Sequence, residues 1–450
     1  MSKTLSQRTA NAFCAFLLAS VAMCGAASAR ADAVTDWAAI MEESTLRVPD
    51  PTLPIRVAAI MQLAVFEAVN TIVGHYEPYL VEPYLGRGGA PAAASPEAAA
   101  IAAAHRVLVE LLPDQAESLD AKRADSLAAL PDGASKSAGI AIGEAAAGAM
   151  LAKRANDGMD ADVPYTPGTL PGQYRPTPPD FIPTFGAHLG RVRSFAIDSV
   201  ARYRVPPPPA LRSKRYAHAY EEVKRVGDIA SRERPKDRAD VARFYAPDDI
   251  VPIYFSAARQ VSLAQRKTLA ENARIFALLG MAIFDAMVVC FDSKYFYDYW
   301  RPVTAIRLGH TDGNRSTDAD PTWTPFVFTP PFPSYPSGHA SFGGAARRVL
   351  EHVFGKDGHT LTLASPEVPD VTLHYASWQQ ITDDIDDARI YGGVHYRFDQ
   401  EEAARQGRKV GRYVLRHWLR PLHRYPDRRD AFVEDASHSD EEARGPAGRQ

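Results

Sequence analysis

Three short segments in the last third of the chain constrain it most. They are Lys294 with Arg301-Pro302, the run Pro336-Ser337-Gly338-His339, and Arg389 with His395 and Asp399. Together they supply three fixed cations, a hydroxyl, a glycine amide and two histidines. Such a donor set suits a tetrahedral oxyanion if the fold brings the segments together.

Length and composition set outer limits. The chain has 450 residues, enough for two ordinary domains or one large one. Its net charge is −3, so no overall basic field favours nucleic acid. Once the N-terminal segment is removed, Cys290 is the single remaining cysteine, which rules out an intramolecular disulfide. Stability must therefore come from a large core.

The N-terminus is typical of an export signal. Lys3 and Arg8 precede an uncharged apolar run, 12–27, and two small-x-small cleavage sites follow at Ala27-Ser28-Ala29 and Ala29-Arg30-Ala31. We expect residues 1–29 to be a signal peptide of a periplasmic or secreted protein, with an uncleaved anchor helix as the alternative.

Apolar periodicity predicts an all-α protein with few strands. The expected architecture is two helical bundles with the oxyanion site in the C-terminal bundle. The predicted parts are the signal 1–29, an N-terminal helical half 30–209 that ends in a Pro-rich wrapping loop, a C-terminal bundle 210–423, and a disordered tail 424–450.

Individual helices can also be predicted. The clearest are 55–73, a helix that opens at Ser95-Pro96, 211–229, 238–245, one long helix from Ser262 to Trp300, 337–354 and 399–419. Residues 355–370 look turn-rich. The run 275–290 is apolar but contains Asp285, so it predicts a buried core helix, and we expect no integral membrane part after signal removal.

The first segment places two cations seven residues apart. On one helix, Lys294 and Arg301 would leave the same face and could converge on one anion, and Pro302 would help to end that helix. The plain alternative is a pair of exposed basic residues.

The second segment predicts a helix start. Amides at a helix N-terminus face an anion, Gly338 allows close backbone approach, Ser337 can donate its hydroxyl, and His339 can act as general acid or base. The alternative is an ordinary N-cap with an incidental histidine.

In the third segment, Arg389 offers a planar fork to two oxygens. The Gly392-Gly393 pair allows a bend that returns His395 to the same point, where it could bind a metal oxyanion or attack phosphorus. Asp399 can orient His395, or it can open the last helix as a capping box with Glu402, and the two roles are compatible.

The spacing Lys-x6-Arg-Pro, Pro-Ser-Gly-His, Arg-x5-His-x3-Asp resembles the vanadium-dependent haloperoxidases, which share a fold and an anion site with the type-2 phosphatidic acid phosphatases. The resemblance covers most of the mature chain. It extends upstream to the segments 66–70, 175–179 and 220–224.

The resemblance implies a role for each residue. Lys294, Arg301 and Arg389 would hold the equatorial oxygens of vanadate, helped by Ser337 and the Gly338 amide. His395 would be the axial ligand to vanadium, His339 the acid-base residue, and Lys294 would polarise bound peroxide. The implied partners are hydrogen peroxide, a halide and an organic acceptor, and the product is hypohalous acid.

Four positions depart from the family pattern or bear on the halide. Ala388 stands where a serine is usual, and Tyr174 where a tryptophan is frequent. Phe332 is the residue of chloride-oxidising members, whereas Phe291 occupies a position that is tryptophan in fungal chloroperoxidases. The two aromatic positions disagree, so the halide is left open.

Two other functions use the same residues. In a soluble secreted acid phosphatase, His395 would form a phosphohistidine and His339 would protonate the leaving group. A non-catalytic helical scaffold with a remnant anion site is the third reading. A homo-oligomer is compatible with the sequence, which does not demonstrate one.

Overall fold

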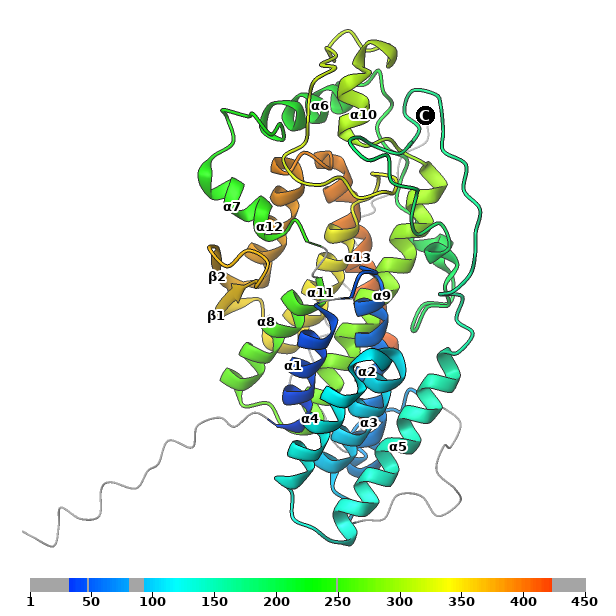
Figure 1. Cartoon of the computed structure of the whole chain (residues 1–450), viewed down its shortest axis with the longest axis vertical. Coiled ribbons are helices and arrows are strands. Elements are labelled where there is room, and N and C mark those ends of the chain that lie inside the picture. The colour runs from blue at the N-terminus through cyan, green and yellow to red at the C-terminus, as the bar shows by residue number, and fades with distance from the viewer. Residues whose placement is uncertain (1–31, 47, 81–92, 248–249, 423–450) are drawn as a thin grey trace, which may run out of the picture. The chain divides into compact units, whose positions relative to one another are not determined.

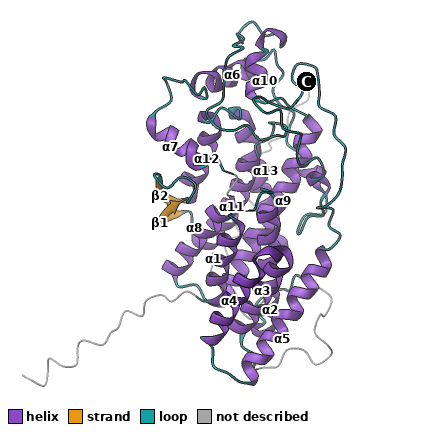
Figure 2. Ribbon diagram, in the orientation of Figure 1, coloured by secondary structure: helices purple, strands orange, loops and turns teal. Residues whose placement is uncertain are grey.

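The protein is described here by a computed structural model covering residues 32–46, 48–80, 93–247 and 250–422. The predicted signal 1–29 and tail 424–450 lie outside the described residues. The described part is mostly helical, as Figures 1 and 2 show, and the all-α prediction is confirmed. The elements are α1 Ala33–Thr45, α2 Leu53–Val73, α3 Pro96–Leu111, α4 Ala116–Ala128, α5 Ala134–Arg154, α6 Lys214–Val226, α7 Lys236–Phe244, α8 Ile250–Gln265, α9 Leu269–Tyr297, α10 Pro302–Arg307, α11 Gly338–Phe354, β1 Asp357–Ala364, β2 Thr372–Ser377, α12 Trp378–Tyr391 and α13 Arg397–His417.

Helices α2, α3 and α5 pack against one another in the N-terminal half (Figure 1). The Ser95 hydroxyl accepts from the Ala98 amide at 3.1 Å and Pro96 takes the first helical position, so the predicted start of α3 is confirmed. A Cβ atom at Gly143 of α5 would lie 2.3 Å from the Ala99 carbonyl oxygen of α3. Glycine is therefore what lets these two helices approach so closely.

Helix α9 joins the two halves, because it packs against α2 on one side and against α11 and α13 on the other. Helices α11 and α13 meet just as closely: a Cβ atom at Gly407 would lie 1.9 Å from the Ser341 carbonyl oxygen. Most buried apolar side chains form a core that runs from Val34 in α1 to Leu419 after α13, and a second, smaller cluster lies around Tyr220 and Trp300. The division at residue 209 stays a prediction.

The Pro-rich segment between α5 and α6 is irregular and is held against α9. The buried Asp285 carboxylate of α9 accepts three successive amides of this segment, from Phe195, Ala196 and Ile197, at 2.6, 2.8 and 2.9 Å. These bonds fix the segment where it passes over the core, since a buried carboxylate must be satisfied by donors.

The same segment also ends α9 earlier than predicted. Asp298 adopts the left-handed conformation at φ 50°, and its carbonyl accepts from the Tyr174 amide at 2.8 Å. Arg301 then precedes α10 as its N-cap, and Pro302 begins that helix instead of ending the previous one. The prediction that Lys294 and Arg301 share one helix face is therefore wrong.

Three further boundaries differ from expectation. Thr268 and Glu271 form a capping box that starts α9, so the predicted helix from Ser262 is two helices, α8 and α9. The stretch predicted as turns holds β1, which pairs antiparallel with β2, the hairpin coloured orange in Figure 2. The last helix starts at Arg397, so Asp399 is its third residue and the predicted capping box with Glu402 is wrong.

Helices α2 and α9 are long and apolar enough to cross a bilayer. In the fold, 83% and 94% of their most apolar windows are buried inside the protein. Core helices of this kind pass the same length and composition test as membrane spans.

Candidate functional site

The fold brings the three predicted segments to one place. Lys294 lies in the last turn of α9, Ser337 is the N-cap of α11, and Arg389 lies in the last turn of α12. His395 lies in the short connection between α12 and α13. The side chains with chemistry are all at most 5% exposed: Lys294, Arg301, Ser337, His339, Arg389, His395 and Asp399.

Backbone carbonyls orient the three cations. The Lys294 ammonium donates to the carbonyls of Pro333 and Ser334 at 2.7 and 2.9 Å. Arg301 donates to the carbonyls of Phe332 and Val394 at 2.8 and 2.9 Å, and Arg389 to that of Tyr245 at 2.8 Å. A carbonyl orients a cation through its dipole and carries no net charge of its own.

Phe332 lies against two of these cations. Its ring centroid is 5.0 Å from the Lys294 nitrogen and 4.9 Å from the Arg301 guanidinium carbon. Phe291 packs on the same ring with centroids 5.2 Å apart. The aromatic pair limits how far the long cationic side chains can move and keeps water from one side of them.

Ser337 is at the N-cap position of α11, but its side chain makes no capping hydrogen bond. Serine at this position usually accepts an amide of the first turn, yet the Ser337 hydroxyl makes no such bond. It is fully buried, and it has no hydrogen-bond partner among the described residues. A buried hydroxyl without a partner costs stability, which makes Ser337 a donor held ready for a ligand.

Gly338 adds space beside that hydroxyl. It lines the cavity, and a Cβ atom there would meet only the Phe342 ring, at 3.3 Å. A side chain would therefore take up cavity volume next to the first amides of α11, which have no partner within the helix.

His395 is oriented by Asp399. The Asp399 carboxylate lies 2.8 Å from His395 Nδ1, and it also accepts from the Ser334 hydroxyl and the Tyr396 amide. On the other side of the ring, Arg301 donates to Nε2 at 3.1 Å. The arrangement fits a neutral imidazole whose Nδ1–H donates to Asp399 and whose Nε2 lone pair faces the cations.

Burial and mutual repulsion shape the charges. Burial, reinforced by the neighbouring cations, lowers the pKa of His339 and of His395 well below the ordinary value. Burial likewise lowers the pKa of Lys294 and raises the pKa of Asp399. A bound anion would offset the repulsion among the positive groups, so the site is built to be completed by negative charge.

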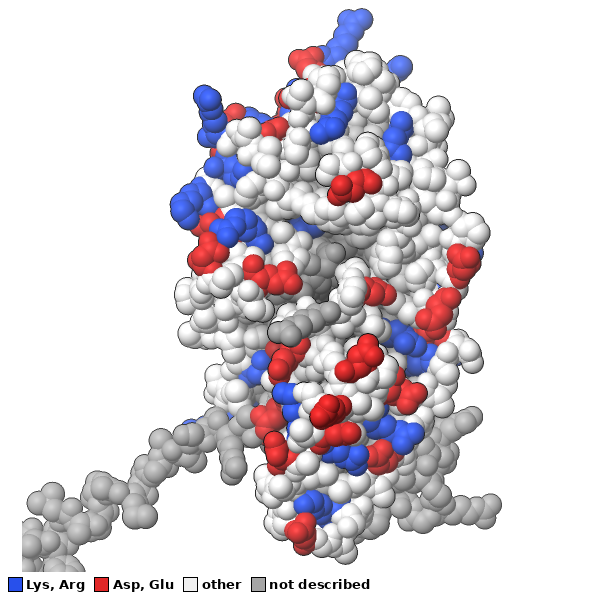
Figure 3. All heavy atoms as spheres, in the orientation of Figure 1, with Lys and Arg blue, Asp and Glu red and all other residues white. Residues whose placement is uncertain are grey.

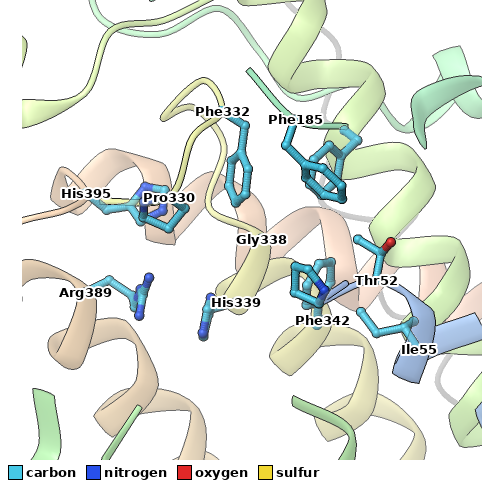
Figure 4. Close-up of a pocket in the computed structure, with 12 residues that line it drawn as sticks. Thr52, Ile55, Phe185, Pro330, Phe332, Gly338, His339, Phe342, Arg389 and His395 are labelled. Carbon is cyan, nitrogen blue, oxygen red and sulfur yellow. The ribbon is translucent and has the colours of Figure 1, made fainter. Parts of the chain in front are cut away.

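A small cavity of about 30 Å³ opens onto these groups. Figure 4 shows His339, Arg389 and His395 on one side of it, with Phe332, Phe185 and Phe342 opposite. Of the predicted residues, Phe332, Gly338, His339, Arg389 and His395 line the cavity. Lys294, Arg301, Ser337 and Asp399 lie behind this lining.

Sequence reasoning missed several contributors. Ser334 holds Asp399, and Tyr245 orients Arg389 through its carbonyl. Thr52 and Ile55 bring the N-terminal bundle to the cavity wall. Ser334 stands three residues before Ser337 and could have been noticed, but the other three lie far along the chain and have no local signal.

The donor set fits a tetrahedral oxyanion such as vanadate. The groups that can donate hydrogen bonds to its oxygens are three buried cations, the amides of a helix N-terminus, and a buried hydroxyl with no partner among the described residues. Neutral His395 offers a nitrogen lone pair. No cluster of three or more metal-binding His, Cys, Asp and Glu side chains occurs in the described ranges.

Comparison with known proteins points the same way. A family described as VCPO second helical-bundle domain matches residues 274–424. Vanadium chloroperoxidase of Curvularia inaequalis is 28% identical over 180 residues, which cover 30% of this chain and 29% of that relative. The match thus spans less than a third of the relative's length.

Solved structures match over far more of the chain. The first bacterial vanadium-dependent iodoperoxidase is 26% identical with a TM-score of 0.72, covering 87% of this chain and 96% of its own. A holo-type bacterial vanadium-dependent chloroperoxidase is 19% identical with a TM-score of 0.65, over 86% and 97%, which shows a shared fold. The motifs, the helical fold and these relatives agree: residues 274–424 match the VCPO second helical-bundle domain, and the chain is similar to vanadium-dependent haloperoxidases.

Proposed function

We propose that the protein binds vanadate and uses it to oxidise a halide with hydrogen peroxide, giving hypohalous acid that halogenates an organic acceptor. The observation that supports this best is the buried Ser337 hydroxyl, which has no partner among the described residues beside three carbonyl-held cations. We further propose that the segment 1–29 directs export to the periplasm or outside the cell.

In this proposal each residue has a task. Lys294, Arg301 and Arg389 hold oxyanion oxygens, and Ser337 with the Gly338 amide donates to the remaining ones. Asp399 keeps the proton on His395 Nδ1, so the Nε2 lone pair of His395 would be available to hold vanadate. Bound vanadate supplies a Lewis-acid centre that activates peroxide toward the halide.

His339 handles the protons. Burial and the neighbouring cations keep its imidazole neutral, so it can accept a proton from incoming peroxide. It would hold that proton near the cavity and give it back when hypohalous acid is released. Phe332 and Phe291 shield the step from bulk solvent.

The test uses the metal-stripped protein. Orthovanadate is titrated in, binding is followed by vanadium NMR, and peroxide-dependent halogenation of a phenol is measured with chloride, bromide and iodide. We expect activity only with vanadate, and its loss in His395→Ala. The three halides rank the preference that Phe332 and Phe291 leave open.

Hydrolysis of an aryl phosphate without vanadate is the parallel assay. If the protein releases phosphate, vanadate inhibits that release and no halogenation occurs, the proposed function would be a phosphatase that uses His395 as nucleophile. Absence of vanadate binding in the folded protein would leave a non-catalytic scaffold.

A further inference from the structure

A wider depression lies outside the anion cavity, and we call it the vestibule. Its volume is about 720 Å³, the size of a pocket for a drug-sized molecule. It shares Pro51, Phe185, Pro330 and Phe332 with the anion cavity. A molecule in the vestibule would therefore lie next to the oxyanion site.

The inner wall of the vestibule is apolar and rigid. It is formed by two loops, and the Phe185 amide of one donates to the Pro331 carbonyl of the other at 2.9 Å. The Tyr295 hydroxyl also donates to the Phe185 carbonyl. Pro183, Pro330 and Pro331 fix the backbone further, so the wall keeps its shape without a ligand.

This wall exposes large side chains to water. Phe328 is 59% exposed and Ile182 is 39% exposed, and both line the vestibule. Exposed apolar surface gathered around a concave site marks binding of an apolar partner, because covering it releases water. Figure 3 shows a hollow in the middle of the viewed face, with acidic side chains at its margin.

The charges around the vestibule narrow the class of ligand. Asp50 and Glu367 line it, and none of its described lining residues is a lysine or arginine. Negative charge at the rim disfavours an anionic molecule and favours a neutral or cationic one.

We propose that the vestibule binds the organic acceptor, a neutral or cationic aromatic compound seated against Phe328 and Ile182, and that halogenation takes place on the bound molecule. The inference rests on the proposed haloperoxidase function. An aromatic carbon forms its bond to the halogen of hypohalous acid, the oxygen–halogen bond breaks, and the ring proton leaves with the hydroxide as water. Halogenation would then favour the compounds that the vestibule binds, whereas freely diffusing hypohalous acid would react according to each compound's own reactivity.

Binding is tested first and without turnover. Saturation-transfer NMR measures 4-ethylphenol on the metal-stripped protein and on two variants. Phe328→Ala lies in the vestibule, whereas Phe181→Ala removes an equally exposed phenylalanine, 61% exposed, that does not line it. We expect the first to weaken binding about tenfold and the second to change it less than about twofold.

A competition then tests selectivity. Tyramine, 4-ethylphenol and 4-hydroxyphenylacetate share a ring and differ in charge, and all three are offered together with bromide, peroxide and orthovanadate. Bound halogenation gives a product ratio shifted away from 4-hydroxyphenylacetate relative to reagent hypobromous acid. In Phe328→Ala the ratio returns toward that of the reagent.

Each result decides something. A product ratio equal to that of the reagent, or equal losses of binding in both variants, overturns the acceptor site. Binding that Phe328→Ala weakens in a protein that shows no halogenation supports the acceptor site and overturns the proposed function instead.

Discussion

The molecule buries two clusters of charged side chains and treats them in opposite ways. Beside the N-terminal bundle, Asp157 sits between Arg56 and Arg154, at 3.0 and 3.1 Å from their nitrogens. In the C-terminal bundle, carbonyls hold Lys294 and its neighbouring arginines, and the Ser337 hydroxyl points at no acceptor among the described residues. The first cluster is complete within the protein, and we propose that an anion completes the second.

The difference separates stability from function. A buried cation that meets a carboxylate has its charge offset at once, which secures the fold but leaves nothing to bind an anion. A cation oriented by dipoles keeps its charge at a cost in folding free energy. Arg154 and Asp157 are buried as deeply as the site residues, so burial alone does not identify the site. The site is identified by the kind of group that each cation contacts, a carboxylate in the first cluster and backbone carbonyls in the second.

The largest effect is expected from breaking the complete cluster. Asp157→Asn leaves Arg154, 1% exposed, without its carboxylate and should lower the free energy of unfolding by about 3–5 kcal/mol. Urea unfolding measures this. Vanadate affinity of the folded fraction should be unchanged, and a loss of affinity would show that the two clusters are coupled.

Binding of an anion at the C-terminal cluster should raise the free energy of unfolding, the opposite of the effect of Asp157→Asn. Orthovanadate at 100 times its dissociation constant should raise the free energy of unfolding by about 2.7 kcal/mol. Thermal unfolding with and without the anion measures this. His395→Ala should abolish most of the gain, and Asp157→Asn should keep it. A gain of equal size in both variants would contradict the comparison.

Ser337→Ala sharpens the contrast within the site. Because its hydroxyl has no partner among the described residues, its removal should relieve the cost of burying it and raise the free energy of unfolding by about 1 kcal/mol. Binding of orthovanadate should weaken by about 1.5–3 kcal/mol, since a bond to a charged ligand is lost. Calorimetric titration measures the affinity. Ser334→Ala is the control for stability. Because the Ser334 hydroxyl already donates to Asp399, its removal should lower the free energy of unfolding.

Buried carboxylates and buried histidines should make contributions of opposite sign to the pH dependence of stability. Burial raises the pKa of Glu67 from 4.5 to about 7, and burial raises the pKa of Asp285 from 3.8 to about 6. The folded protein binds more protons than the unfolded chain in these windows, so these groups make stability fall as pH rises through them. The lowered pKa values of His339 and His395 do the reverse, and stability rises with pH up to about 6.5.

Variants separate the two slopes. Glu67→Gln should remove part of the falling slope between pH 4.5 and 7, and His395→Asn part of the rising one. Each group contributes at most about 1.4 kcal/mol per pH unit. Unfolding free energies at several pH values measure both. A slope that neither variant alters would show that other groups control it.

Much of the site could be predicted because its chemistry is local in sequence. Arg389 and His395 are joined by a short bend, and Ser337 with His339 starts one helix. Spacing alone therefore shows which side chains can act together. The prediction that Asp399 orients His395 agrees with the 2.8 Å contact between them.

The break after α9 could not be predicted from the local sequence. Residues 298–300 contain no glycine or proline, and the helix ends there because Tyr174 and Gly172 bond to Asp298 and Trp300 from a segment more than 120 residues earlier. Arg301 reaches the site through this tertiary contact. Similarly, β1 alternates only at Leu361 and Leu363, its two buried residues, which is too short a pattern to predict a strand from the sequence.

The backbone carbonyls that hold Lys294, Arg301 and Arg389 also affect how the protein responds to anions in solution. Carbonyl dipoles orient positive charge without choosing among tetrahedral anions of similar size and charge, so inorganic phosphate is expected to compete with vanadate for the same space. The fraction of working protein then follows the ratio of the two anions around it. Phosphate in a medium or buffer would act as an inhibitor.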